Sequence, residues 1–134
     1  VDKFAFSDDS RSTLGTGLST ATRLQAAMAN SGTAGYFGGG RTAATVRVTT
    51  VDKFAFSDDS RSTLGTGLST ATRLQAAMAN SGTAGYFGGG RTAATVRVTT
   101  VDKFAFSDDS RSTLGTGLSA AALEPVGVAN AGTL

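Results

Sequence analysis

The chain has 134 residues, of which 40% are hydrophobic and 16% are charged, a composition typical of a folded domain rather than a disordered segment. It contains no Cys and no His, which excludes disulfides, thiolate chemistry and catalytic triads built on either residue. The formal net charge of +2 is too weak for a nucleic-acid footprint, and no run approaches the ~18 apolar residues of a membrane span. Neither nucleic acid nor a membrane is therefore expected as a partner.

The chain is an array of one unit, because residues 1–69 recur without change at residues 51–119. Two full 50-residue repeats are followed by 34 further residues, 101–134. Each full repeat has five basic and three acidic residues, a net charge of +2, whereas residues 101–134 have two basic and four acidic residues, a net charge of −2. Arrays of this kind bury their core by stacking neighbouring units, so the unit determines the fold.

In chain order, each repeat opens with a predicted strand and a tight turn. In the second copy, Val51–Phe56 alternates so that Phe54 and Phe56 share one face, as in a half-buried strand. Ser57–Ser60 is a cluster of Ser and Asp, whose side chains bond nearby backbone amides in turns. A short strand at Ser62–Leu64 is expected next, followed by a loop that contains Gly.

The following stretch, Ser19–Asn30, is compatible with a helix or a strand. A helix capped by Ser19 is favoured by the spacing of the apolar residues Ala21, Leu24, Ala27 and Met28. The equivalent stretch of the third copy contains Pro125 and Gly127, which cost about 3 and 1 kcal/mol inside a helix. A strand tolerates a proline at its start, so a strand at about Gln25–Ala29 is predicted.

Two further segments complete the unit. Ala34–Gly38 is a predicted strand, closed by three consecutive Gly residues. Thr45–Val48 is expected to point its two Val side chains inward and to run into Val51–Phe56 through a bend near Thr49–Thr50. The sequence therefore predicts an all-β unit of four short strands.

This unit resembles the kelch repeat. The aromatic pair and double glycine of Ala34–Gly39 are similar to one kelch strand, and Val51–Phe54 matches the strand that precedes an acidic turn. The ~50-residue period also agrees, although Leu takes the place of the usual Trp at Leu14, Leu64 and Leu114. The resemblance implies kelch-like β-propeller blades of four antiparallel strands, used more often as interaction scaffolds than as enzymes. It is nearest to degenerate arrays of phage structural and bacterial surface proteins, which implies a virion-associated or extracellular location.

The resemblance divides the chain into a partial blade at 1–18, complete blades at 19–68 and 69–118, and a partial blade at 119–134 with one strand near Val126–Asn130. Propellers have about four to eight blades, so the ring is expected to close by oligomerisation. The last strand of one chain and the first hairpin of another are expected to share a three-stranded blade, which makes the homodimer a ring of about six blades. A trimer, a larger ring, a filament or a fragment of a longer propeller are the alternatives.

The two ends of the sequence differ from the repeat. Residues 120–134 lose the equivalent of Arg23 and gain Glu124 and Pro125, which fits either a capping unit or sequence drift. The absence of Met before Val1 predicts a processed, trimmed or engineered start. Both a natural duplication and an engineered array are consistent with this sequence.

No catalytic, cofactor or metal site is predicted. Asp8–Asp9, which recurs at Asp58–Asp59 and Asp108–Asp109, lacks the alternating oxygen ligands of a calcium loop, so a solvated turn is expected. Gly38–Thr42 lacks the Lys-Ser/Thr ending and the strand-to-helix context of a phosphate-binding loop, so its glycines are expected to serve the strand end.

The sequence therefore predicts a non-enzymatic structural or interaction scaffold, a symmetric oligomer of identical blades whose partner is another copy of itself. The alternative is a lectin-like ring that binds glycans in repeated pockets between blades. That alternative requires Tyr36 and Tyr86 to be exposed near Arg41 and Arg47, where they can stack on sugars. Otherwise the two tyrosines are expected to lie in the core or at a blade edge.

Overall fold

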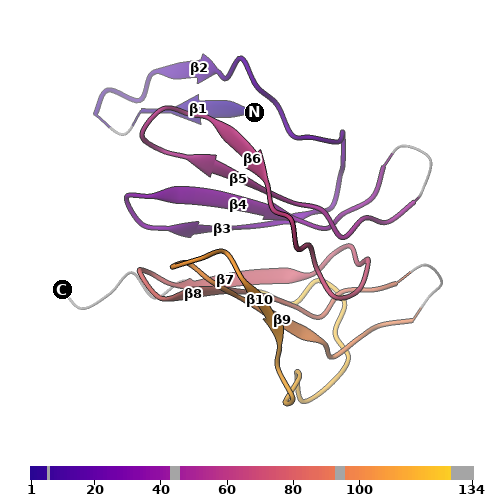
Figure 1. Cartoon of the computed structure of the whole chain (residues 1–134). Coiled ribbons are helices and arrows are strands. Elements are labelled where there is room, and N and C mark those ends of the chain that lie inside the picture. The colour runs from indigo at the N-terminus through magenta and orange to yellow at the C-terminus, as the bar shows by residue number, and fades with distance from the viewer. Residues whose placement is uncertain (6, 43–45, 93–95, 128–134) are drawn as a thin grey trace.

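The computed structural model describes residues 1–5, 7–42, 46–92 and 96–127, which form ten strands and no helix (Figure 1). The strands make three antiparallel sheets of two, four and four strands. The all-β prediction is confirmed. Within these residues the three sheets do not close a ring.

Each sheet is built from strands that are consecutive in sequence. The first sheet pairs β1 (Asp2–Phe4) with β2 (Arg11–Thr13). The second has the order β3 (Ala26–Asn30), β4 (Ala34–Gly38), β5 (Val51–Ala55) and β6 (Arg61–Thr63). The third repeats that order in β7 (Ala76–Asn80), β8 (Ala84–Gly88), β9 (Val101–Ala105) and β10 (Arg111–Thr113). One 50-residue period thus supplies one four-stranded sheet.

The ambiguous stretch before Asn30 is a strand, as the proline in the third copy indicated. Residues of β3 alternate between buried and exposed, with Ala26 and Met28 on the buried face. Leu24, two residues before the strand, has a left-handed backbone with φ of 61°, which a helix would not allow. The predicted strand is therefore confirmed, and the alternative of a helix is excluded by both the burial pattern and the backbone.

Two sequence expectations differ from the structure, and a third, the shared face of Phe54 and Phe56, is confirmed. Thr45 lies outside the described residues, and Val46 is exposed rather than inward, because Arg47 forms only an isolated bridge there. Phe56 lies just beyond β5, which ends at Ala55, and it is exposed, but its ring shares the face of Phe54 as expected, because its Cε1 lies 3.4 Å from where a Cβ of Gly35, the partner of Phe54, would be. In the expected strand Val126–Asn130, the first two residues form no strand, and residues 128–130 lie outside the described part.

Successive repeats contact each other through their backbones. The amide of Gly40 donates to the carbonyl of Thr72 at 2.8 Å, which brings two repeats together just beyond the end of β4. Gly39 has a φ of +65°, and a Cβ there would lie 2.8 Å from the same carbonyl, so only glycine fits. The amide of Gly90 donates to Ala122 in the equivalent way at 3.0 Å, so the residues after β10 continue the same stacking.

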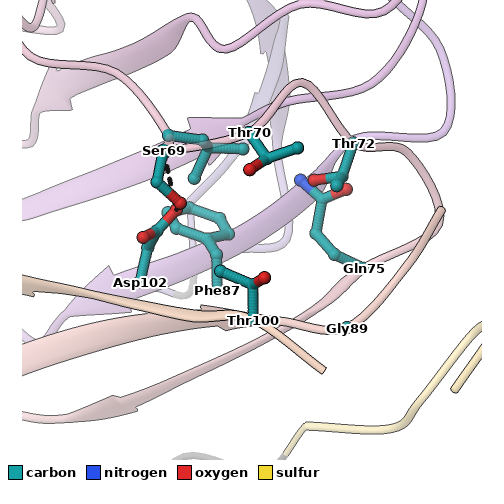
Figure 2. A pocket seen from close by; sticks show the side chains of 9 residues that line it. Ser69, Thr70, Thr72, Gln75, Phe87, Gly89, Thr100 and Asp102 are labelled. Carbon is teal, nitrogen blue, oxygen red and sulfur yellow. Dashed lines mark hydrogen bonds between the residues drawn. The ribbon is translucent and has the colours of Figure 1, made fainter. Parts of the chain in front are cut away.

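A small cavity lies beside each four-stranded sheet. In the second copy its walls include Ser69, Thr72, Gln75 and Phe87, and Figure 2 shows these side chains converging on it. Its volume of about 10 Å³, like that of the equivalent cavity in the first copy, leaves room for about one water molecule. Gln75 closes one side by donating from Nε2 to the carbonyl of Gly38 at 2.8 Å, which adds a further bond between repeats.

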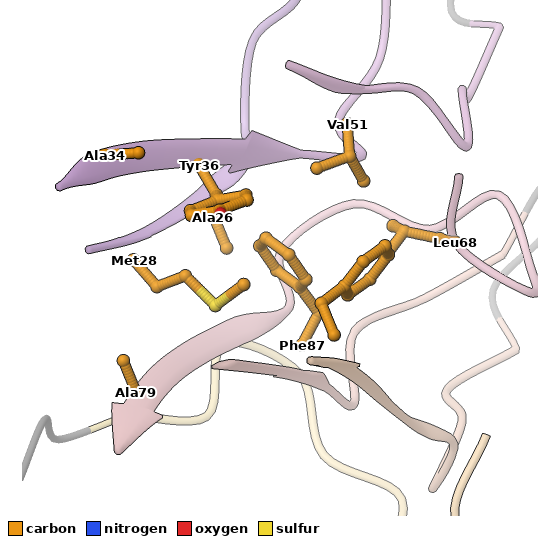
Figure 3. Close-up of a cluster of buried hydrophobic side chains, with 9 residues drawn as sticks. Ala26, Met28, Ala34, Tyr36, Val51, Leu68, Ala79 and Phe87 are labelled. Atoms are coloured by element: carbon orange, nitrogen blue, oxygen red, sulfur yellow. The ribbon is translucent and has the colours of Figure 1, made fainter. Parts of the chain in front are cut away.

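The main core lies between the two four-stranded sheets (Figure 3). Met28 and Tyr36 are directly opposite each other in register, and both point from the second sheet toward the third. Phe87 points back from β8, and its ring lies so close to Gly38 that an added Cβ would be 2.8 Å from it. The glycine and aromatic positions that define β4 and β8 therefore form the packing between neighbouring units.

The strand order bears on how chains could share a sheet. β4 lies between β3 and β5, and pairs with both along its full length. The first hairpin, β1–β2, corresponds to β5–β6 and has no strand of the β4 type beside it in the described structure. The expected three-stranded blade between two chains would combine a β3-type strand with this hairpin. It would lack the β4-type strand that pairs with both of them in each four-stranded sheet.

Candidate functional site: the contact surface between repeats

Two side chains of the second sheet contact one carboxylate that belongs to the third sheet, that of Asp109. Lys53 Nζ lies 2.6 Å from Asp109 Oδ2, and the hydroxyl of Tyr36 donates to Oδ1 at 2.8 Å. The Phe106 ring stacks on Tyr36 with 5.3 Å between centroids. Asp109 holds the Lys53 ammonium and thereby raises the pKa of Lys53. This cluster joins side chains 56 and 73 residues apart, so it fastens one repeat to the next.

The same contact occurs one repeat earlier. Lys3 Nζ donates to both carboxylate oxygens of Asp59 at 2.8 Å, which joins the first hairpin to the second sheet. Asp59 and Asp109 both have a left-handed backbone with φ of 57°, and each carboxylate accepts from a lysine 56 residues earlier in the chain. The second Asp of each turn is therefore an acceptor for the preceding repeat.

The first Asp of each turn has a different role. Asp58 Oδ1 accepts a hydrogen bond from the Ser60 amide at 3.0 Å, and hydrogen bonds from Ser60 lower the pKa of Asp58. This is the solvated turn that the sequence predicted. The contact made by the second Asp was missed, since turn composition says nothing of a partner more than fifty residues away. The recurrence of Lys and Asp-Asp at fixed positions in every repeat was the available signal.

The pKa of Tyr36 gives a test of this contact. Burial, and then the hydrogen bond to Asp109, raises the pKa of Tyr36 to about 12. An unfolded phenol titrates near 10, so the stabilisation is complete below about pH 10 and is lost as the pH rises to about 12. We expect the free energy of unfolding to fall by roughly 2–3 kcal/mol more in the wild type than in Tyr36→Phe over this window, measured by urea titration. Parallel pH profiles would contradict this.

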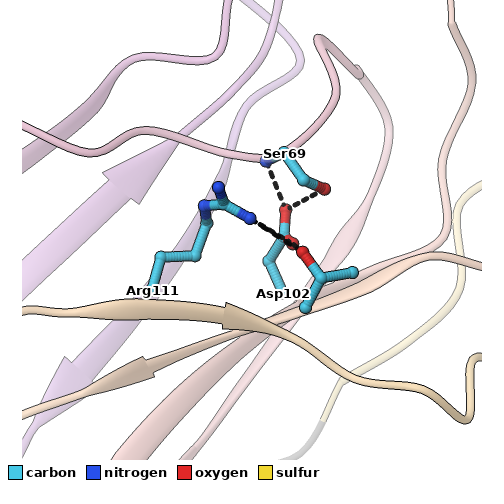
Figure 4. A network of polar contacts seen from close by, with 4 residues as sticks. Ser69, Asp102 and Arg111 are labelled. Atoms are coloured by element: carbon cyan, nitrogen blue, oxygen red, sulfur yellow. Dashed lines mark hydrogen bonds and ion pairs between the residues drawn. The ribbon is translucent and has the colours of Figure 1, made fainter.

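A second polar cluster fixes the chain as it enters each sheet. The buried carboxylate of Asp102 accepts hydrogen bonds from the amide and hydroxyl of Ser69 at 2.8 and 2.9 Å, and from Thr113 at 2.7 Å (Figure 4). Arg111 approaches the same carboxylate at 3.5 Å. Asp52 accepts from Ser19 and Thr63 in the equivalent way. Asp102 thus connects the segment before β7 to β9 and β10, the third and fourth strands of its sheet, and Asp52 does the same in the preceding sheet.

The other predicted site residues are placed as follows. Tyr36 is 1% exposed and its hydroxyl is used by Asp109, so it is a core residue and has no free ring face for a sugar. Gly38 ends β4 and no helix follows it in the described residues, so this segment is not a phosphate-binding loop. The described residues also contain no group of three or more side chains able to hold a metal ion, and no helix that could span a membrane.

The third sheet carries a second copy of the contact surface, on which residues 122–127 cover the part near Leu74 and Gly89 but leave Met78 exposed. Met78, Tyr86 and Lys103 lie in one row across β7, β8 and β9, as their equivalents do across β3, β4 and β5. In the first copy this row faces the next sheet and Met28 is 8% exposed, whereas Met78 is 36% exposed. Lys103 has no hydrogen-bond partner among the described residues. Asp9, in the first hairpin, likewise accepts no hydrogen bond from them.

No protein-family model and no curated protein matches this chain. The resemblance to kelch repeats therefore stays a prediction, and the function must be argued from the contacts alone.

Proposed function

We propose that the chain is a non-catalytic structural scaffold that associates head to tail with further copies of itself. The proposal rests on one observation: each end of the stack of sheets presents one side of the contact that joins neighbouring repeats, without its counterpart among the described residues. One end presents Tyr86 and Lys103, whose equivalents hold Asp109 within the chain. The other end presents Asp9, the equivalent of Asp109. Copies that meet end to end can therefore repeat a contact that the chain already makes internally.

The apolar side chains at the two ends support the same association. Met78 is exposed on the third sheet, and Phe4 is exposed on the first hairpin. Their equivalents Met28 and Phe54 are buried where a neighbouring unit or strand covers them. Because the two end surfaces differ, the contact is heterologous, and it produces a ring if the rotation closes and a filament if it does not.

We further propose that the assembly is a kelch-like propeller whose ring is completed by oligomerisation, with the homodimer favoured. The resemblance of the repeat to kelch strands and the four-stranded, antiparallel form of each sheet support this architecture. A β4-type strand for the sheet at each junction must then come from a further copy. A trimer, a larger ring or a filament uses the same head-to-tail contact.

The proposal is tested by removing the charge of Asp9. Asp9→Asn keeps a residue that tolerates the left-handed backbone at this position, where φ is 55°. We expect light scattering on a sizing column to give a mass above the 13.4 kDa of one chain for the wild type, and self-association roughly tenfold or more weaker for Asp9→Asn. Lys103→Gln, at the opposite end, is expected to weaken it equally.

Asp8→Asn is the matched control, since it removes the same charge from the same turn. Asp8 Oδ1 accepts from the Ser10 amide at 3.0 Å, a bond that an Asn side chain can also accept. We expect this variant to associate like the wild type. A wild type that is monomeric at all concentrations, or equal weakening by Asp8→Asn and Asp9→Asn, would overturn the proposal.

A further inference from the structure

Each full repeat places three arginines opposite one another at one end of its sheet. Arg41 forms antiparallel bridges with both Arg23 and Arg47, and the backbone bonds between Arg23 and Arg41 are 2.9 Å in both directions. The second copy repeats this arrangement with Arg91 at the centre, between Arg73 and Arg97. Side chains directly opposite in an antiparallel bridge project from the same face, so each set forms a ladder of guanidinium groups.

No acidic side chain forms an ion pair with the central arginine of either ladder in the part of the chain that the structure describes. Gly38 pairs with Val51 at the end of the sheet next to Arg41, while the Asp58–Asp59 turn lies beyond Ala55, at the opposite end. All ten acidic residues of the chain are in the described part, and none of them forms an ion pair with Arg41 or Arg91. The Asp-Asp turns thus lie at one end of each four-stranded sheet and the arginine ladders at the other, with Glu124 as the acidic residue nearest a ladder, since its amide donates to the carbonyl of Leu74, next to Arg73, at 3.1 Å.

The two ladders also lie near each other. The chain segments on either side of residues 43–45 and 93–95 extend to the same side of the molecule, at the right of Figure 1. Partial burial lowers the pKa of Arg41, and the positive charges of Arg23 and Arg47 lower it further. Arg91 acts on Arg41 in the same direction. The backbone shows that the ladders are neighbours, because the amide of Leu74, next to Arg73, donates to the carbonyl of Leu24, next to Arg23, at 3.0 Å. Like charges placed opposite one another destabilise a sheet, and such a cost is typical of a functional surface.

We propose that the two ladders, apart from Arg73, which is only 6% exposed, form one binding surface for an anionic polysaccharide, with the sulfate or carboxylate groups of successive sugars held by the accessible guanidinium groups. Arginine presents a planar fork of donors that binds such oxyanions in bidentate fashion. Hydroxyl groups suited to sugars lie in the same segments, on Thr22, Thr42 and Thr49. The segments 20–25, 39–42 and 46–50 contain no aromatic residue on which a base could stack, which disfavours single-stranded nucleic acid.

This surface is independent of the proposed self-association. Both ladders belong to one chain, and neither Asp9 nor Lys103 is part of them. It also differs from the pockets that a lectin-like propeller would use, because the cavities beside the sheets hold about one water molecule each.

The test replaces the central arginine of both ladders. The double variant Arg41→Gln and Arg91→Gln keeps the backbone bridges and removes two like charges, so it is expected to fold as the wild type does. Binding of a heparin-type sulfated oligosaccharide, measured by calorimetry at physiological salt, is expected to weaken about a hundredfold, roughly tenfold for each arginine. Thermal unfolding of the unbound variant checks that its fold is unchanged.

The control is Arg11→Gln with Arg61→Gln, which removes the same charge from equivalent positions of the same two repeats, on β2 and β6. We expect it to retain the wild-type affinity. A desulfated oligosaccharide and a polyuronate, used as further ligands, show which oxyanion is bound. No binding of any anionic saccharide, an equal loss in the control, or tighter binding of single-stranded DNA than of the saccharides would overturn the proposal.

Discussion

Replacing Phe104 by Ala is expected to lower the free energy of unfolding by about 3–5 kcal/mol. Phe104 is 0% exposed, and its ring packs edge-on against Phe87 with 5.8 Å between centroids. Truncation to Ala removes this contact and leaves a cavity on the face of the third sheet that meets the second sheet. Urea denaturation followed by circular dichroism measures the loss.

The repeat supplies its own controls for this substitution. Phe4 and Phe54 occupy the same position in the other copies but are 59% and 4% exposed. At a protein concentration where the chain is monomeric, Phe4→Ala is expected to cost less than about 1 kcal/mol, and Phe54→Ala as much as Phe104→Ala. An equal cost at all three positions would contradict the exposed position of the first hairpin.

These three phenylalanines also show what the sequence can and cannot predict. Alternation of apolar residues located β5 and β9, and the substitution of Pro125 into the third copy identified β3 as a strand. The sequence around Phe4, Phe54 and Phe104 is identical, so no local pattern could distinguish their environments. The difference comes from the neighbouring unit, which a unit-by-unit prediction does not contain.

The candidate surfaces were harder to predict for the same reason. The contact of Asp109 with Tyr36 and Lys53 needs the register between sheets, and turn composition indicated only solvation. The arginine ladders need the bridge between Arg41 and Arg47, which interrupts the alternation on which the expected inward position of Val46 was based. Both features depend on which residues lie opposite each other, and short polar strands specify this weakly.

Replacing Asp102 by Ala is expected to lower the free energy of unfolding by about 3 kcal/mol. The carboxylate accepts three hydrogen bonds, two from Ser69 and one from Thr113, and it is buried. Removal of the carboxylate leaves the amide of Ser69 without an acceptor where water has little access. It also removes the bonds that hold the segment before β7 against β9. Urea denaturation again gives the loss.

Asp2 is the control that separates two contributions to the loss at Asp102: the bonds from Ser69 in the segment before β7, and the bond from Thr113 within the β9–β10 hairpin. Asp2 keeps the equivalent bond from Thr13 at 2.7 Å and the approach of Arg11 at 3.4 Å, but it is exposed and accepts nothing from a serine amide in the described structure. Asp2→Ala is therefore expected to cost less than about 1 kcal/mol. If the two substitutions cost the same, the hairpin bonds carry the stability. A loss of unfolding free energy that is at least threefold larger for Asp102→Ala than for Asp2→Ala means that the bonds from Asp102 to Ser69, in the segment that leads into β7, supply most of the stabilisation.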